Sequence, residues 1–273
     1  MARDLVRLSY ARLVQLAAER NVPVDYLERD YVLTVVLRQI ARLPELGDQL
    51  VLKGGLALHH IYGSHRMSVD MDFTAERRLD PELLYDAIEA IHAFRIRMPQ
   101  TIGPTRHSLT LTPVTYVGPR GVESHFEIEI SYRELVILPP RVVPFASPFC
   151  DSFDVRVMPI EEIVAEKMRA LYQRAKPGDL YDLFFILDSP TLNCDLEQTN
   201  RLLPTKFALV AGKWRRARFF KRLEERATQI ELLWESALAD VILGELPPFD
   251  ETIATVRRRL RRLPPIVQAG SRD

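Results

Sequence analysis

The sequence has little of several residue types, and each scarcity excludes a class of protein. The 273 residues include only two cysteines, Cys150 and Cys194, so a disulfide framework is excluded and free thiols in a reducing compartment are expected. No apolar run approaches the ~20 residues that a membrane-spanning helix needs. The first twenty residues hold no apolar core of signal-peptide length. We therefore expect a cytoplasmic protein with no membrane segment.

An excess of charge of one sign is also missing, because 37 Lys and Arg balance 37 Asp and Glu. This balance excludes the simplest argument for nucleic-acid binding, a strongly basic chain. The cations are unevenly divided, with 31 arginines and only six lysines. Since the two side chains are not chemically interchangeable, the lysines that fall inside motif-like segments, Lys53 and Lys167, are singled out as candidates for a site.

Hydrophobic periodicity predicts strands in the first part of the chain and helices in the second. After two helices at 5–20 and 26–43, a short strand, a Gly54-Gly55 turn and a helix are expected between residues 50 and 62. The other expected strands are 68–74, 108–117, 124–132 and 153–158. The other expected helices are 82–94, 160–173, 179–187, 195–202, 207–243 with a possible break, and 249–263.

This order predicts an α+β domain followed by a helical domain. Prolines at 139, 140, 144 and 148 resemble a linker and mark the best boundary between them. We place the α+β domain, with its N-terminal helices, at 1–158 and the helical domain at 159–273.

The first candidate for chemistry is Asp70 with Asp72, which share one face of the expected strand with Ser68. Paired carboxylates are held apart by solvent or together by a cation such as Mg²⁺, which also binds substrate phosphates. The Gly54-Gly55 turn precedes them and would offer backbone N–H groups to a phosphate. An Asp-x-Asp pair alone is also typical of two solvated surface acids.

A third carboxylate is expected from the strand at 124–132, where Glu127 and Glu129 alternate with apolar residues. A further acid beside an Asp pair suits metal-assisted phosphoryl or nucleotidyl transfer. We prefer Glu129 and keep Glu127 as the alternative. The same alternation is typical of a sheet with one solvated face.

The helix at 160–173 and its successor carry the third candidate group. Lys167 and Arg174 can share a helix face, and Lys167 would place a point charge on a triphosphate. Asp179 is expected to cap the next helix, and Asp182 to orient Lys167 through an ion pair. An ordinary charged helix surface would give the same residues.

Together, these segments resemble the AbiEii/MenT-type nucleotidyltransferase toxins of abortive-infection toxin–antitoxin pairs. The resemblance covers about residues 26–188. It is carried by Lys53-Gly-Gly-Leu-Ala-Leu, by Arg66-Met-Ser-Val-Asp-Met-Asp-Phe73, by Glu166-Lys167 with Ala170-Leu171, and by Asp179-Leu-Tyr-Asp182-Leu. It implies a DNA-polymerase-β-like core with a helical C-terminal part, transfer of nucleotides with Mg²⁺, a tRNA acceptor end as target in several members, and a cognate antitoxin.

Carried over by position, the resemblance assigns catalytic roles to Ser68, Asp70, Lys167 and Asp182. It implies that Asp70 and Asp72 bind the metal, with Glu129 as our added ligand. The nucleotide-binding candidates are Lys53, Gly54, Gly55, Arg66, Ser68 and Lys167. The family commonly has Ser or Thr after the glycines, whereas this chain has Leu56, so we expect Ser68 to supply the missing hydroxyl.

Local charge suggests where RNA would bind. Residues 213–226 carry seven cations against two acids, and residues 256–262 carry five arginines and no acid. Trp214, Phe219 and Phe220 interleave with the first cluster, as base stacking would favour, although a core position for Trp214 is the simpler reading. The RNA-binding candidates are Lys213, Arg215, Arg216, Arg218, Lys221 and Arg222.

These observations favour a monomeric toxin that transfers nucleotides from an NTP to RNA, most readily the tRNA 3′ acceptor end, and so blocks translation. Transfer to a protein or a small molecule remains open, as does a binding module without catalysis. A metal-dependent nuclease is less favoured, because Glu127-Ile-Glu129-Ile-Ser131 lacks the lysine of the acid-x-Lys pattern. No His/Cys cluster has zinc spacing along the sequence, and we expect one of His59 and His60 to be a packing residue.

Overall fold

The computed structural model describes residues 7–99, 105–134, 136–209 and 212–264. The chain divides into two compact units. The first comprises Met1–Pro159 with the short segment Asp240–Glu245, and the second comprises Ile160–Ala239 and Leu246–Asp273. The ends of the predicted domains, 1–6 and 265–273, lie outside the described residues. No helix in the described part of the chain is long and apolar enough to cross a bilayer.

The first unit is built on one seven-stranded mixed sheet in the order β3-β4-β5-β2-β1-β7-β6. The central strands are β5, β2 and β1, where β2 runs parallel to β5 and antiparallel to β1. The strands are β1 (Leu50–Lys53), β2 (Met71–Ala75), β3 (Arg95–Arg97), β4 (Ser108–Val117), β5 (Glu123–Ser131), β6 (Arg141–Ser147) and β7 (Cys150–Val157).

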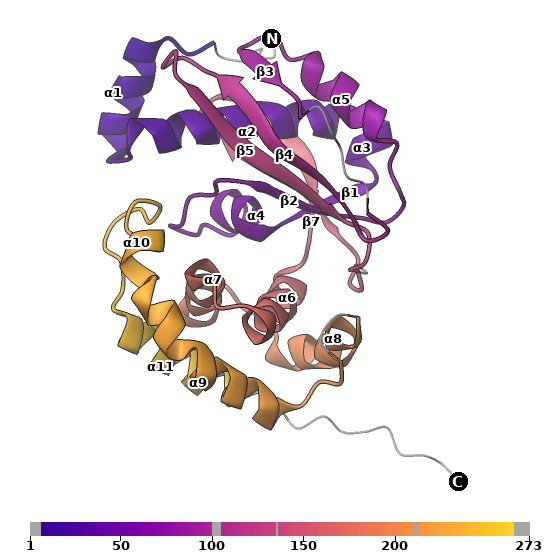
Figure 1. The fold of residues 1–273 in the computed structure, drawn as a ribbon, viewed down its shortest axis with the longest axis vertical. Helices are drawn as coiled ribbons and strands as arrows, with labels where there is room; N and C mark the ends of the chain where they lie inside the picture. The colour runs from indigo at the N-terminus through magenta and orange to yellow at the C-terminus, as the bar shows by residue number, and fades with distance from the viewer. Residues whose placement is uncertain (1–6, 100–104, 135, 210–211, 265–273) are drawn as a thin grey trace. The chain divides into compact units, whose positions relative to one another are not determined.

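Among the described residues of this unit there are five helices, and α2 is the most deeply packed of them. Twelve of its 19 residues are buried, and it contacts α1, α3, α5 and β7. Figure 1 shows this helix, in indigo, lying along the sheet with α1 at one end and α3 and α5 toward the other. The helices are α1 (Tyr10–Arg20), α2 (Val24–Arg42), α3 (Pro44–Gly47), α4 (Gly54–His60) and α5 (Pro81–Glu89).

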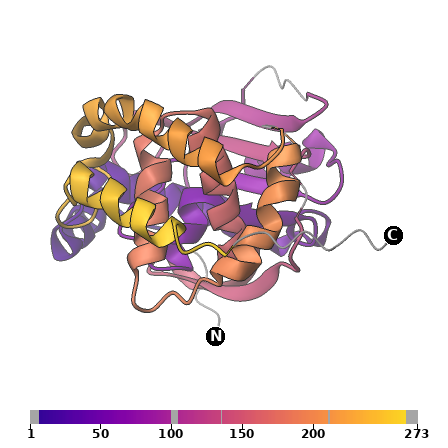
Figure 2. The same ribbon diagram turned by 90° about the horizontal axis from the view of Figure 1, so that it is seen from below.

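The second unit contains helices and no strand among its described residues. Its centre is α6, which packs against α7, α8 and α9, while α11 packs on α7. Figure 2 shows these helices grouped together, in colours from rose to yellow. They are α6 (Ile160–Gln173), α7 (Pro177–Asp188), α8 (Leu196–Ala208), α9 (Arg216–Leu232), α10 (Trp234–Leu238) and α11 (Phe249–Leu260).

The predicted fold class is confirmed, since every strand precedes residue 158 and the described chain beyond it is helical. The predicted bounds of β4 and α6 match the structure, as does the strand, glycine turn and helix of β1 and α4. These segments have a strong apolar period, which sequence reading detects best, although the period of β4 changes phase between Leu111 and Val114. The predicted helix at 207–243 is divided, because α8 continues to Ala208 and a separate α9 follows.

The proline-rich linker was a wrong prediction, because residues 141–147 form strand β6. This strand pairs with β7 through six residues, including Pro144 opposite Asp154. Strand β6 lies at the edge of the sheet and has a neighbouring strand on one side. A proline, which has no N–H, therefore does not interrupt a second row of interstrand hydrogen bonds there. The punctuating prolines therefore mark an edge strand and not a domain boundary.

Two further elements differ from their predicted bounds, one by starting later and one by ending earlier. The strand expected at 68–74 starts at Met71, because the Ser68 hydroxyl donates to the Asp70 carbonyl oxygen and turns the chain there. The helix expected to reach Phe94 ends at Glu89, and the chain forms the short strand β3 soon afterwards.

Candidate active site

The centre of the candidate site is a row of charged residues across three neighbouring strands. Lys53 at the end of β1 is paired in register with Asp72 of β2, and Asp72 is paired with Glu129 of β5. Side chains that are directly opposite in adjacent strands point to the same face of the sheet. The sheet therefore presents one ammonium and two carboxylates side by side, with strands spaced about 4.8 Å apart.

The Glu129 carboxyl is affected by this crowding. Its pKa is raised by reduced solvation and then by the negative charge of Asp72, with smaller contributions from Glu134 and Glu127, whereas Lys53 lowers it. Although the residue as a whole is exposed, its carboxylate faces three other acids and one lysine. Such a site favours a bound cation.

The two glycines of the predicted turn let side chains approach the backbone. Gly54 has φ of +67°, and a Cβ added there would lie 2.0 Å from Asp72 Oδ2. A Cβ on Gly55 would lie 2.8 Å from Ser68 Oγ and 2.9 Å from Arg66 Nη2. A larger residue at Gly54 would be strained by the positive φ and would overlap Asp72, whereas one at Gly55 would require the Ser68 and Arg66 side chains to move.

Asp70 lies just before β2 and contacts the neighbouring strand β5 through its side chain, whereas Asp72 pairs with β5 through the main chain. Its Oδ1 accepts a hydrogen bond from the Glu127 N–H at 3.1 Å. This bond fixes the Asp70 carboxylate beside the strand that carries Glu129. The shared strand face predicted for Ser68, Asp70 and Asp72 does not exist as such, because only Asp72 of the three lies in the strand. Ser68 is buried, and its hydroxyl is used locally.

Glu134 was missed by sequence reasoning. It lies in the segment after β5, is 8% exposed, and forms an ion pair with Lys53 Nζ. Nothing in the local pattern around Glu134 indicates a partner 81 positions earlier. A buried carboxylate on Lys53 fixes the ammonium at the edge of the carboxylate row.

The second unit holds Lys167 in a buried ionic cluster of its own. Lys167 Nζ lies 2.9 Å from Asp179 Oδ1 and 2.7 Å from Asp182 Oδ2, so the predicted ion pair with Asp182 is present. Arg174 Nε donates to Asp179 Oδ2 at 2.8 Å. Both carboxylates are almost fully buried, whereas Lys167 retains 14% of its side-chain exposure. The cluster holds the ammonium in one place.

The prediction that Asp179 caps the helix after 160–173 is wrong. Lys176 is the N-cap of α7, and Asp179 lies in its first turn with its side chain turned toward Lys167 and Arg174. Burial alone would raise the pKa of the Asp179 carboxyl, but the two cations hold it well below its usual range.

The arginine-rich segment of the second unit, residues 213–226, has some side chains exposed to solvent and others buried in the core. The side chains of Lys213, Arg215, Arg218, Lys221 and Arg222 are exposed. Arg216 is used within the fold, because its guanidinium donates to the carbonyl oxygens of Arg261 and Leu263. Trp214 and Phe219 are buried against each other, so neither is available for base stacking.

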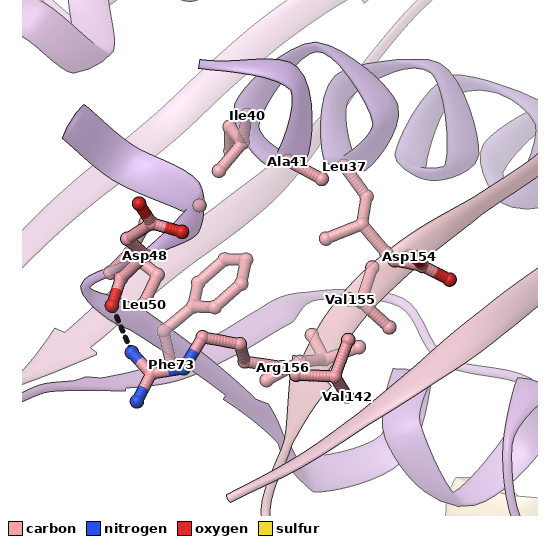
Figure 3. A pocket seen from close by; sticks show the side chains of 12 residues that line it. Leu37, Ile40, Ala41, Asp48, Leu50, Phe73, Val142, Asp154, Val155 and Arg156 are labelled. Atoms are coloured by element: carbon pink, nitrogen blue, oxygen red, sulfur yellow. Dashed lines mark hydrogen bonds between the residues drawn. The ribbon is translucent and has the colours of Figure 1, made fainter. Parts of the chain in front are cut away.

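A separate pocket in the first unit lies on the opposite face of the sheet from the charged row. Its volume is about 190 Å³, and it is lined mainly by apolar side chains of α2, β1, β2 and β7. Figure 3 shows Leu37 and Ile40 above Phe73, with Arg156 bonded to the Asp48 carbonyl oxygen. Phe73 alternates with Asp72 along β2, so this pocket and the charged row face away from each other.

Residues 35–255 match the family model described as nucleotidyl transferase AbiEii toxin, type IV toxin–antitoxin system. That match spans most of the chain. This protein belongs to the AbiEii nucleotidyltransferase toxin family. Membership implies a nucleotide substrate and an antitoxin partner. No curated protein matches the sequence.

Solved structures share the AbiEii fold at low sequence identity. The chain is similar to MenT4, a nucleotidyltransferase toxin from Mycobacterium tuberculosis H37Rv, with 20% identity, a TM-score of 0.67, and 93% of this chain and 88% of that one covered. It is also similar to JHP933 from Helicobacter pylori, with 21% identity, a TM-score of 0.55, and coverage of 89% and 94%. The charged row is thus set in a nucleotidyltransferase fold.

Proposed function

We propose that this AbiEii protein transfers a nucleotide from an NTP to RNA, at the 3′ acceptor end of tRNA, and thereby blocks translation. The observation that carries the proposal is the register of Asp72 with Glu129, with Lys53 beside them in the same row. A crowded set of carboxylates next to a glycine turn is suited to holding a cation and the phosphates bound to it. We further propose that it acts as a monomer in the cytoplasm.

The donor set of the row fits Mg²⁺, which prefers carboxylate oxygens. Asp70, Asp72 and Glu129 are the residues that would hold it, and Glu129 is preferred to Glu127 because Glu129 is the residue paired in register with Asp72. When bound, Mg²⁺ would supply positive charge to the triphosphate and lower the pKa of an attacking hydroxyl. The like-charge effect of Asp72 on the Glu129 pKa supports this assignment.

The chain's own residues would position the reactants around that charge. An RNA hydroxyl oxygen forms a bond to the α-phosphorus, the bond from that phosphorus to the bridging oxygen of the β-phosphate breaks, and pyrophosphate leaves while the hydroxyl proton is released. In this proposal Lys167, oriented by Asp182, offsets the charge that builds on pyrophosphate. Lys53, Arg66, Ser68 and the Gly54-Gly55 turn would bind the nucleotide.

The exposed cations around α9 are the proposed RNA surface. Five of the six candidates are solvent-accessible, and Arg218 also lies 5.9 Å from the centre of the Tyr172 ring. A plot of the logarithm of the binding constant against the logarithm of the salt concentration becomes shallower by about one unit for each phosphate contact that is lost. We expect Lys221→Ala to weaken tRNA binding and reduce that slope, and Arg216→Ala to act mainly on folding, because Arg216 bonds the main chain.

One assay distinguishes the alternatives: incubation with Mg²⁺, bulk tRNA and each α-labelled NTP in turn. The proposal predicts label on intact tRNA, lost when the 3′ terminal hydroxyls are first oxidised with periodate. Asp70→Ala should abolish labelling with a melting temperature close to that of the wild type. Label on protein, label on a small molecule, cut RNA, or tRNA binding with no reaction would each replace the proposal with one of the other readings.

A further inference from the structure

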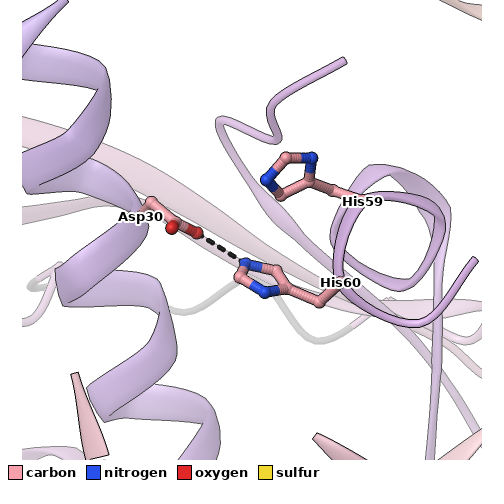
Figure 4. A group of neighbouring side chains, drawn as sticks. All are labelled: Asp30, His59 and His60. Atoms are coloured by element: carbon pink, nitrogen blue, oxygen red, sulfur yellow. Dashed lines mark hydrogen bonds and ion pairs between the residues drawn. The ribbon is translucent and has the colours of Figure 1, made fainter. Parts of the chain in front are cut away.

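A second group of potential metal ligands lies away from the charged row, where helices α2 and α4 meet. Asp30 of α2 and His59 and His60 of α4 each bring one ligand atom to within 4.8 Å of the others. Figure 4 shows both imidazole rings on the side of α4 that faces Asp30. The two histidines are at the last positions of α4, whereas Gly54, which contacts Asp72, is at the first.

The protonation of His59 leaves a nitrogen suited to a metal. Its Nδ1 lies 2.7 Å from the Ser64 carbonyl oxygen, which can only accept a hydrogen bond. Nδ1 therefore carries the proton, and the lone pair of the neutral ring is on Nε2. Figure 4 shows this second nitrogen directed toward Asp30 and His60. A histidine whose other nitrogen donates to a main-chain carbonyl is the usual arrangement of a metal ligand.

His60 and Asp30 are held more tightly than a surface pair would be. His60 Nε2 lies 2.7 Å from Asp30 Oδ1, and the two side chains are 8% and 7% exposed. The His60 ring also packs against buried Phe145, with 4.4 Å between ring centres. The other four histidines of the chain, His65, His92, His107 and His125, are exposed.

We propose that Asp30, His59 and His60 form a binding site for one Zn²⁺ ion, which links α4 to α2. Two imidazole nitrogens and one carboxylate oxygen, with water in the fourth position, match the ligands that Zn²⁺ takes in proteins. Mg²⁺, which prefers an all-oxygen shell, does not suit this group. The site is thus distinct in chemistry and place from the carboxylate row proposed for nucleotide transfer.

Binding requires the three ligand atoms, now within 4.8 Å of one another, to adjust to the spacing around a tetrahedral ion. Two ligands at about 2.05 Å from a tetrahedral ion are about 3.3 Å apart, so His60 Nε2 and Asp30 Oδ1 would separate by roughly 0.6 Å. The proton shared by these two atoms leaves to solvent as the ion binds. His59 needs no change of tautomer, because its Nε2 is already unprotonated.

Two conservative variants separate metal binding from a hydrogen-bonded pair that has no metal. In His59→Asn, the amide can still donate to the Ser64 carbonyl oxygen but the Nε2 ligand is lost. In His60→Gln, the amide can still donate to Asp30 but cannot replace an imidazole as a ligand. His92→Ala and His125→Ala remove exposed imidazoles and serve as matched controls.

The full-length protein is stripped with a chelator and titrated with Zn²⁺ by calorimetry. We expect one Zn²⁺ per chain, with affinity lowered more than about 100-fold in His59→Asn and in His60→Gln, beyond the 10–100-fold that loss of an outer hydrogen-bond partner causes. Saturating Zn²⁺, at ~100 times Kd, should raise the melting temperature by about 5–10 °C in the wild type and in both controls.

No Zn²⁺ uptake by the wild type, or uptake that both conservative variants retain, would overturn the proposal. Should His60→Gln fail to fold, His59→Asn alone decides the question, because its hydrogen bond to Ser64 is preserved. Calorimetry and melting are read without nucleotide or RNA, so failure of nucleotidyl transfer would not affect either outcome.

Discussion

The two lysines that we propose as nucleotide-binding residues, one in each unit, are in contrasting electrostatic surroundings. In the sheet unit, Lys53 lies beside a row where the Glu129 pKa is raised, first by burial and then by the negative charge of Asp72, which the positive charge of Lys53 does not offset. In the helical unit, Lys167 and Arg174 are matched by Asp179 and Asp182, and the Asp179 pKa is lowered. The first arrangement favours a cation from outside, and the second holds a cation that the chain itself supplies.

The largest expected effect follows from removing the lysine of the balanced cluster. Lys167→Met leaves Asp179 and Asp182 buried with less compensation, and breaking a buried ionic group costs about 3–5 kcal/mol. Lys53→Met leaves one buried carboxylate, Glu134, without this partner instead of two, so it should cost less, at the lower end of that range, about 3 kcal/mol. Urea unfolding of both variants measures the difference. Equal losses would remove the distinction between the two lysines.

A conservative exchange at the same position should lower both activity and stability. Lys167→Arg keeps the charge but forces a larger, planar group between two carboxylates that are 2.9 and 2.7 Å from Nζ. We expect nucleotide transfer to fall at least about 10-fold with a stability loss of about 1–3 kcal/mol from overpacking. Lys176→Arg, at an exposed position, is the control. Full transfer by Lys167→Arg would show that the type of cation is incidental.

Acid should weaken the balanced cluster in a defined pH range. A carboxyl with a lowered folded pKa adds stability above its unfolded pKa of about 3.9, and this stability is lost as pH falls through the folded pKa. Between about pH 4 and pH 2, wild type should therefore lose more stability than Asp179→Asn, which has no such proton to take up. Thermal melting across this range compares them. Parallel curves would contradict the pairing of Asp179.

The smallest expected effect is a change in the titration of Glu129. Asp72→Asn removes a negative neighbour and should lower the Glu129 pKa, while Lys53→Met removes a positive one and should raise it. Carboxyl ¹³C NMR titration of the three proteins gives the direction of each change. A Glu129 pKa that does not respond to either substitution would separate this residue from the row.

The sequence predicted those parts of the fold and site whose signals are local. The turn at Gly54-Gly55 and the helix that carries Lys167 follow from patterns of a few residues, and both are present. The ion pair of Lys53 with Glu134 and the burial of Asp179 depend on chain segments that only the tertiary fold brings together. Pro144 gave a local signal that was wrong. Proline usually indicates a loop, but it is tolerated in a strand at the edge of a sheet, and only the tertiary fold shows that β6 is such a strand.

We propose that the carboxylate row and the Lys167 cluster act as one catalytic unit in nucleotide transfer. The most direct measurement is the single-turnover rate of nucleotide transfer to tRNA by wild type, Glu129→Gln, Lys167→Arg and the double variant. Residues that act as a unit have non-additive effects, so the double variant should be no slower than the slower single variant. Rate losses that multiply in the double variant would mean that the two groups act independently and would contradict the claim.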